Sequence, residues 1–273
     1  MKMIEDKKTA VIYNAWESPS PEAVFLLVHG LGAHAGRWKF FSEFLLQNNI
    51  SSYAIELKGF GETECLKGHV DSFNAYLKDI SSLYDIIIRE NKGKKVFLVG
   101  ESVGALISFL TAAEKPDLFD GLICVSPAFA GKLKISPLTY IRQLLPLIYN
   151  PKKQFNIPFD SAMCTRDTAY QKIMDADPKE HRLATSKFIF NLLIAQLKAG
   201  ILKNKIKIPV LFLLSGEDKL VSSDASRRIF NGLKVKDKVI MEYPGMYHSL
   251  SVDLGRDKVF EDILAWAQKR VKT

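Results

Sequence analysis

Short runs of apolar residues recur along the chain, and most are followed by a segment whose apolar positions have helical spacing. The runs predict strands at Val11–Trp16, Ala23–Val28, Ser51–Leu57, Val96–Val99, Gly121–Val125, Val210–Leu214 and Lys238–Tyr243. The intervening segments predict helices at Trp38–Asn48, Phe73–Glu90, Ala105–Ala113, Ser223–Leu233 and Val259–Val271. Because the apolar runs are continuous, the strands must be covered on both faces. The alternation of strands and helices indicates an α/β fold with a mostly parallel sheet.

The segment from Ala128 to Lys207 breaks this rhythm, because it contains no run that predicts a strand. We expect helices at Ile135–Tyr149 and Ala184–Lys198, with Pro146 kinking or ending the first of them. Open α/β sheets bind ligands at the carboxyl ends of their strands. We therefore predict a core formed by residues 1–127 and 208–273, and a helical lid of residues 128–207 over that edge of the sheet.

The charge of the chain is concentrated in the predicted lid. The 273 residues include 38 Lys and Arg against 30 Asp and Glu, which gives a net charge of +8. Residues 128–208 contain 14 of the basic and 5 of the acidic residues. This excess indicates either solvated lysines or attraction of an anionic substrate or an anionic lipid interface, which the lid would contact transiently. Since no basic block is interleaved with aromatics and no zinc-finger spacing occurs, we expect no nucleic-acid partner.

Cysteine usage and the N-terminal segment indicate the compartment. Cys65, Cys124 and Cys164 lie far apart and form no CxxC pair, so we expect free thiols and a reducing environment. Met1–Thr9 is polar and lacks the apolar region of a secretory signal, and Ala23–Val28 is far too short to span a bilayer. We therefore expect a cytoplasmic protein.

Gly100–Gly104 carries the strongest chemical signal of the sequence. This Gly-Glu-Ser-Val-Gly segment follows the strand Val96–Val99 and precedes the helix Ala105–Ala113. A serine in a tight strand-to-helix turn projects its hydroxyl above the sheet edge, and its neighbours must be small for the backbone to turn. The helix N-terminus offers free N–H groups to an oxyanion. Ser102 is therefore the candidate nucleophile.

A serine needs a base to take its proton, and a carboxylate to orient that base. His248 lies in a loop directly after the strand Lys238–Tyr243, whereas His181 lies in the predicted lid. Asp218 follows the strand Val210–Leu214, with Glu217 beside it as an alternative. The chain order of nucleophile, acid and base suits this architecture. We predict His248 as the base and Asp218 as the acid.

The oxyanion hole requires a second N–H donor. His29–Gly32 follows the strand Ala23–Val28, and its glycines let the backbone approach a ligand closely. We predict that the N–H groups of Leu31 and Val103 form the oxyanion hole. His29 has no second or third ligand at a suitable spacing, so we do not interpret it as a metal ligand.

Nearly the whole chain resembles the monoacylglycerol lipase and lysophospholipase branch of the α/β-hydrolase superfamily. The resemblance rests on His29–Arg37, Gly100–Gly104, Leu110–Pro116, Ser126–Pro127, Ser215–Asp218 and Tyr247–His248. It implies an α/β-hydrolase fold with a helical lid inserted after the sixth strand. It also implies a catalytic triad of Ser102, Asp218 and His248, with Leu31 and Val103 as oxyanion donors.

The resemblance implies a serine carboxylic ester hydrolase that acts on a lipid-like monoacyl ester through an acyl-enzyme, with no metal or organic cofactor. Esterases for short-chain or aromatic (hydroxycinnamoyl-type) esters, and a serine aminopeptidase or acyltransferase on the same scaffold, remain alternatives. A non-catalytic binding protein would typically have lost a member of the triad. The chain departs from the family in having Ala33 where a glutamate is usual and Glu101 where a histidine is common. Glu56–Thr63 likewise keeps the glycines of a family motif but lacks its histidine.

Overall fold

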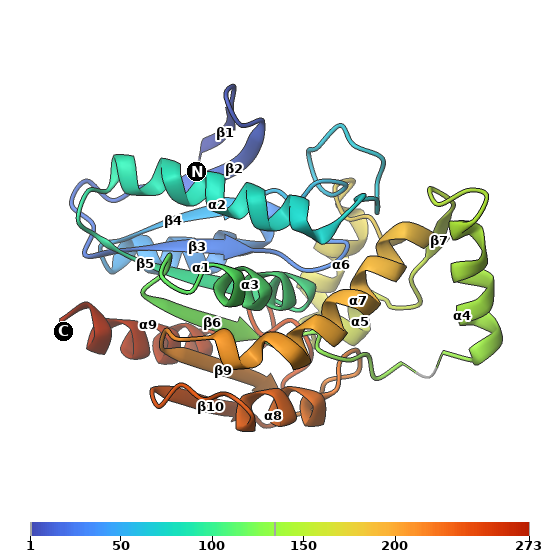
Figure 1. The fold of residues 1–273 in the computed structure, drawn as a ribbon. Coiled ribbons are helices and arrows are strands. Elements are labelled where there is room, and N and C mark those ends of the chain that lie inside the picture. The colour runs from blue at the N-terminus through green and yellow to red at the C-terminus, as the bar shows by residue number, and fades with distance from the viewer. Residues whose placement is uncertain (1, 134, 273) are drawn as a thin grey trace.

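An eight-stranded sheet runs through the computed structural model, which describes residues 2–133 and 135–272 (Figure 1). Met1, Lys134 and Thr273 lie outside the described residues. The strand order is β1-β2-β4-β3-β5-β6-β9-β10. The strands are β1 (Lys2–Asp6), β2 (Val11–Trp16), β3 (Ala23–Val28), β4 (Ile50–Ile55), β5 (Lys95–Glu101), β6 (Gly121–Val125), β9 (Val210–Ser215) and β10 (Lys238–Tyr243). β2 runs antiparallel to β1 and β4, and the other pairings are parallel. The predicted α/β fold is confirmed.

Helices cover both faces of the sheet, as the continuous apolar strands require. Along β3, Val24, Leu26 and Val28 belong to one apolar cluster, and the alternate residues belong to another. The first cluster packs under α2 (Phe73–Glu90), α3 (Val103–Glu114) and α8 (Ser223–Asn231). The second packs under α1 (Lys39–Gln47), which follows the short helix η1 (Ala35–Trp38), and under α9 (Arg256–Val271).

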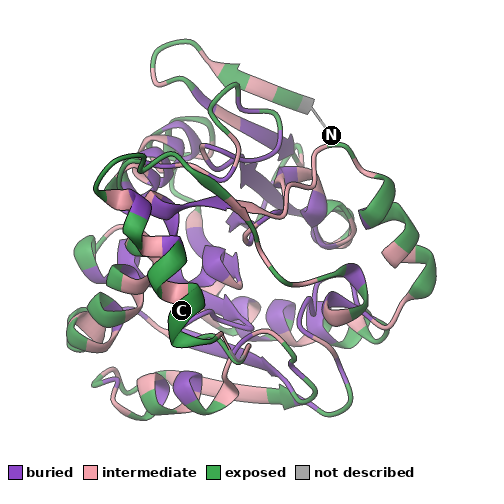
Figure 2. Ribbon diagram, turned by 90° about the vertical axis from the view of Figure 1, so that its right-hand side faces the viewer, coloured by how far each residue is buried: buried purple, intermediate pink, exposed green. Residues whose placement is uncertain are grey.

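A long insertion, residues 128–207, separates β6 from its sheet neighbour β9. It contains α4 (Pro137–Leu144), η2 (Leu145–Leu147), β7 (Gln154–Asn156), α5 (Ser161–Cys164), α6 (Thr168–Ala176), β8 (Leu183–Thr185), α7 (Ser186–Leu202) and η3 (Lys203–Lys205). Figure 1 shows α4 and β7 beyond the right-hand end of the sheet. Figure 2 looks onto this end and shows buried central strands surrounded by helices with exposed faces. None of the helices described here combines the length and the hydropathy that a transmembrane span requires.

The predicted strands and helices of the core are confirmed, with ends that differ by a few residues at most. The structure also contains β1, a short and mostly charged strand at the sheet edge, which no apolar run in the sequence predicts. The expectation of no strand between residues 128 and 207 is wrong, because β7 pairs with β8 antiparallel. Both strands are three residues long, too short to give an alternating pattern. The helix expected at Ile135–Tyr149 ends at Leu144, since Pro146 lies in the 3₁₀ turn that follows.

Phe97, at the centre of the sheet, offers a test of this packing. Its fully buried ring lies 5.4 Å from that of Phe25 and 5.9 Å from that of Trp266 between centroids. We predict that Phe97→Ala lowers the free energy of unfolding by about 3–5 kcal/mol, because it leaves a cavity under α9. Denaturant unfolding measures this change. Ile88→Ala, at an exposed position of α2, should change it by only about 0.5 kcal/mol; similar losses for both variants would contradict the packing.

Candidate active site

Ser102 lies in the tight turn between β5 and α3, with a backbone φ of +58°. This left-handed conformation is strained for a residue with a side chain. Four backbone hydrogen bonds hold it, one of them from the Leu106 N–H to the Ser102 carbonyl (3.2 Å). The Ser102 N–H donates to the Val125 carbonyl (2.9 Å), and the Ser102 carbonyl accepts from the N–H groups of Ala105 and Ala128 (3.1 Å each). The turn is therefore fixed by the adjacent strand β6, by α3 and by the start of the insertion.

The two glycines that flank this turn are required by close backbone contacts. A Cβ atom on Gly104 would lie 2.3 Å from the Val28 carbonyl oxygen, at the end of β3. A Cβ atom on Gly100 would lie 2.4 Å from the Gly104 carbonyl oxygen. Both distances are far shorter than a van der Waals contact allows. The sequence requirement for small residues around Ser102 thus has a direct steric cause.

His248 and Asp218 meet through a buried hydrogen bond. His248 Nδ1 lies 2.8 Å from Asp218 Oδ2, and both side chains are almost fully buried. The other carboxylate oxygen accepts from the backbone N–H groups of Leu220 (2.8 Å) and Val221 (2.9 Å). Burial raises the pKa of Asp218, but the His248 ring and these hydrogen bonds outweigh it and lower the pKa overall. Glu217, the alternative acid, is exposed.

A single cavity brings the five predicted site residues together. Ser102, His248, Leu31 and Val103 all line it, and Asp218 lies behind His248. Within residues 2–133 and 135–272, no acceptor is found for the backbone N–H of Leu31 or Val103. Gly30 makes the approach possible, because a Cβ atom there would lie 3.1 Å from the Cβ of Ser102. The cavity can therefore place a carbonyl group between a hydroxyl, an imidazole and two free donors.

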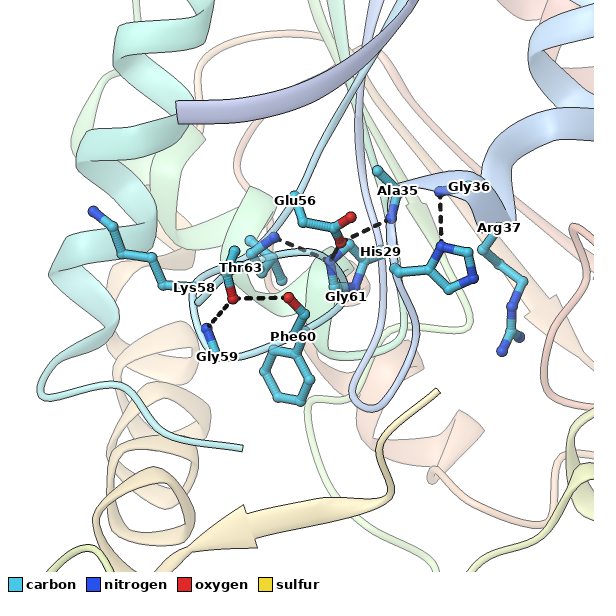
Figure 3. A network of polar contacts seen from close by, with 12 residues as sticks. His29, Ala35, Gly36, Arg37, Glu56, Lys58, Gly59, Phe60, Gly61 and Thr63 are labelled. Carbon is cyan, nitrogen blue, oxygen red and sulfur yellow. Dashed lines mark hydrogen bonds and ion pairs between the residues drawn. The ribbon is translucent and has the colours of Figure 1, made fainter. Parts of the chain in front are cut away.

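A buried polar network supports the loop that carries Leu31 (Figure 3). His29 Nε2 accepts from the Leu57 backbone N–H (3.1 Å) and lies 3.2 Å from Glu56 Oε1. The same Glu56 oxygen accepts from the Ala35 N–H (3.0 Å). Burial raises the pKa of Glu56, but the contacts with His29 and Ala35 lower it overall. His29 thus helps to shape the loop, and its contacts are with protein groups.

Two further carboxylates, Glu101 and Glu180, line the cavity. Glu101 Oε1 accepts from the Ser251 N–H (3.1 Å) and Oε2 accepts from the Ser251 hydroxyl (2.9 Å). Glu180, from the insertion, forms a buried ion pair with Arg37. Glu101 thereby ties the nucleophile turn to the loop that carries His248, and Glu180 ties the insertion to the core.

The charges around His248 set its protonation. Burial lowers the pKa of His248, but the Asp218 carboxylate, through its charge and its hydrogen bond, raises it above the ordinary value. Glu101 raises it further, whereas Arg37 opposes this effect. Burial also raises the pKa of Glu101, although the Ser251 hydrogen bonds and the nearby charges of His248 and Arg37 act in the opposite direction.

Sequence reasoning missed the contacts of Arg37, Glu180, Glu101 and Ser251. The Arg37–Glu180 pair spans 143 positions, and the Glu101–Ser251 pair spans 150. No spacing rule connects residues so far apart. A glutamate beside the candidate nucleophile was the one visible signal. Among the described residues, no group of three His, Cys, Asp or Glu side chains could hold a metal ion.

Residues 19–255 match the model of the Hydrolase_4 family, described as serine aminopeptidase, S33. The chain belongs to this family. The resemblance to α/β-hydrolases of the monoacylglycerol lipase type is confirmed. The hydrolase is 28% identical to human monoglyceride lipase over 260 residues, which cover 93% of this chain and 85% of the relative. It is also 23% identical to the Bacillus subtilis phospholipase YtpA, covering 94% of this chain and 99% of the relative.

Solved structures are similar over the whole chain. The crystal structure of a monoacylglycerol lipase from Paleococcus ferrophilus has a TM-score of 0.86 at 28% identity, and the match covers 100% of this chain and 99% of that one. A monoglyceride lipase from Saccharomyces cerevisiae has a TM-score of 0.87 at 20% identity, with 98% of this chain and 94% of that one covered, which shows the fold.

The charge of Glu101 should be visible in the pH dependence of the hydrolase. We predict that Glu101→Gln moves the acid limb of the kcat/KM profile to lower pH, because loss of the negative charge lowers the pKa of the His248 base. The profile is measured with a water-soluble p-nitrophenyl ester. Ser251→Ala keeps the carboxylate and should move the limb less. An unchanged limb, or one moved to higher pH, would contradict the electrostatic role of Glu101.

Proposed function

We propose that this hydrolase cleaves the ester bond of a lipid-like molecule with one acyl chain, such as a monoacylglycerol or a lysophospholipid. In this proposal Ser102 is the nucleophile, His248 the general base and Asp218 the acid that orients it. The observation that carries it is the 2.8 Å contact of His248 with Asp218, with Ser102 and His248 lining the same cavity. The similarity to human monoglyceride lipase and to the phospholipase YtpA supports this substrate class.

The chemistry follows from the positions of these groups. Ser102 Oγ attacks the ester carbonyl while His248 takes its proton, and the imidazolium is stabilised by Asp218. The N–H groups of Leu31 and Val103 stabilise the oxyanion, each by about 3 kcal/mol. Collapse of the tetrahedral intermediate breaks the ester C–O bond, and His248 returns the proton to the leaving alcohol. Water, deprotonated by the same base, then hydrolyses the acyl-enzyme and releases the carboxylic acid.

The walls of the cavity support an acyl substrate. They are largely apolar, and the insertion supplies Ala128, Leu133, Ile157, Phe159, Met174 and Leu192. An acyl chain gains about 0.8 kcal/mol for each CH₂ group that it buries against such a surface. We therefore also propose that the insertion, residues 128–207, acts as a lid over a core formed by residues 1–127 and 208–273.

The charged groups of the cavity disfavour an aminopeptidase. A free amino group in the substrate needs an unpaired carboxylate. Glu180, the carboxylate that the insertion contributes to the cavity lining, is paired with Arg37, and Glu101 accepts both hydrogen bonds from Ser251.

A panel of substrates tests the remaining alternatives. The kcat/KM values are compared for monoacylglycerols, lysophospholipids, short-chain esters, hydroxycinnamate esters and aminoacyl amides. The proposal requires that the long-chain monoacyl esters have the highest kcat/KM.

We propose that the lid touches a lipid interface during turnover. Its outer face exposes large apolar side chains, with 53–85% of each accessible: Leu138, Ile141, Leu145, Ile148 and Tyr149. Lys152 and Lys153 follow Tyr149 after two intervening residues and are exposed. Apolar side chains with neighbouring lysines suit an anionic lipid surface.

We also propose that the protein is located in the cytoplasm. The three unpaired cysteines support this location, because thiols stay reduced there.

Replacement of the candidate nucleophile tests the mechanism. We predict that Ser102→Ala lowers kcat by several orders of magnitude and abolishes labelling by a fluorophosphonate, because it removes the proposed nucleophile. The rates are measured with a p-nitrophenyl ester, and folding is checked by thermal melting. Ser108→Ala, which removes a buried hydroxyl in the helix α3 that follows Ser102, should retain activity. Ester turnover by the Ser102→Ala variant would disprove the assignment.

The exposed face of the lid gives a second test. We predict that Ile148→Ser lowers the hydrolysis of monoacylglycerol in anionic vesicles about tenfold, since this side chain no longer enters the interface. Its kcat/KM for a water-soluble ester should not change. Met3→Ser, at an exposed apolar residue of β1, should leave both activities unchanged.

Added salt should lower the rate at which the unmodified protein hydrolyses monoacylglycerol in anionic vesicles, because salt screens the attraction of the lysines to the lipid. A rate that does not change with salt would contradict the role of the lysines.

A further inference from the structure

Asp253, five residues after His248, is a buried charge that the proposed mechanism does not use. Its carboxylate is 0% exposed. Oδ1 accepts from the backbone N–H of Arg166 (2.7 Å) and from the Thr165 hydroxyl (3.0 Å). Oδ2 accepts from Arg166 Nε (2.9 Å) and from the backbone N–H of Tyr247 (2.7 Å). Such a group is stable in the interior only because every one of these donors is in place.

The donors come from two segments far apart in the sequence. Thr165 and Arg166 belong to the turn between α5 and α6 of the insertion, whereas Tyr247 directly precedes His248. Arg166 also donates from Nη2 to the Leu254 carbonyl. Asp253 therefore joins the insertion to the loop that carries the candidate base.

The residues on either side of His248 both donate backbone hydrogen bonds to this junction. On one side, the Tyr247 N–H donates to Asp253. On the other, the Ser249 N–H donates to the Cys164 carbonyl of the insertion (2.8 Å). A displacement of the turn from Cys164 to Asp167 would remove the acceptor of the Ser249 N–H, and it would take three donors from the Asp253 carboxylate that accepts from the Tyr247 N–H. The turn and the imidazole are therefore expected to move together.

We propose that Asp253 and Arg166 are a positioning pair for His248, so that the turn Cys164–Asp167 of the insertion helps to set the place of the catalytic base. This inference rests on the proposed role of His248. A displacement of about 1 Å in a catalytic group can cost about 100-fold in rate. The insertion would thus contribute to the chemical step even for a small ester that needs no acyl-binding wall.

The test separates positioning from simple stabilisation. Arg166→Met removes the side-chain donors to Asp253 Oδ2 and to Leu254 while leaving the backbone turn intact. Activity is measured with p-nitrophenyl acetate below the melting temperature of each variant, and active sites are titrated with a fluorophosphonate. We expect kcat for each titrated site to fall about 10- to 100-fold, with KM changed less than about threefold. The rate of Ser102 labelling should fall by a similar factor, while its final stoichiometry stays the same.

Arg256→Met is the matched control. Arg256 pairs with Asp167 of the same turn (3.5 Å) and lies over the Phe40 ring, but its side chain does not hold the His248 loop. The Arg256→Met variant should keep the wild-type kcat for each titrated site. Arg166→Lys retains the charge and should recover part of the loss. Asp253→Asn provides a second perturbation, and the Arg166→Met/Asp253→Asn double variant should lose less than the sum of the two single changes.

A merely structural pair would give a different result. In that case Arg166→Met and Asp253→Asn would lower the melting temperature and the number of titrated sites, but kcat for each site would match the wild type. That result would overturn the inference and leave the proposed function intact. If the unmodified protein neither hydrolysed esters nor labelled Ser102, the proposed function itself would fail.

Discussion

The hydrogen bond between His248 and Asp218 is the interaction on which the rest of the site depends. An aspartate this deeply buried is stable as a carboxylate only when its oxygens are satisfied. Here the imidazole takes one oxygen and two backbone N–H groups take the other. The bond fixes the ring so that its second nitrogen is free for a proton. In the proposed mechanism this orientation lets His248 accept the proton of Ser102.

The parallel sheet explains why these groups can meet. β3, β5, β9 and β10 run in the same direction, so the loops after them emerge at one edge. Those loops carry the segment that we propose as the oxyanion hole, together with the proposed nucleophile, acid and base. The positions of the loops are then refined by buried polar contacts that cross between them, through Glu56, Glu101 and Asp253. The fold brings the loops close together, and hydrogen bonds to the buried carboxylates connect one loop to the next.

The core and the positions of the candidate site residues were predictable because they depend on local patterns. Continuous apolar runs located the central strands, and the Gly-Glu-Ser-Val-Gly segment located the strand-to-helix turn that carries the candidate nucleophile. Asp218 was preferred to Glu217 on position alone, and the structure buries the first and exposes the second. β1 and the β7–β8 pair could not be predicted, since these strands have three to five residues and each depends on a neighbouring strand. Contacts such as Arg166 with Asp253 join positions 87 apart, and only the folded chain brings them together.

The insertion illustrates a further limit of pattern reading. Its apolar stripe on α4 and η2 predicts a helix, yet the stripe faces outward in the structure, where Ile148 is 85% exposed. A periodic pattern indicates an amphipathic helix but does not say what its apolar face will meet. In this structure the side chains of that face are exposed and are not packed against the core.

The most direct test of the account is the kcat of Asp218→Asn on a water-soluble p-nitrophenyl ester. Asparagine keeps the shape of the side chain but favours the wrong tautomer of His248. We predict a fall of about 10⁴-fold in kcat. Glu217→Gln, at the exposed neighbouring acid, should remain close to the wild type. An Asp218→Asn variant within tenfold of the wild-type kcat would contradict the account.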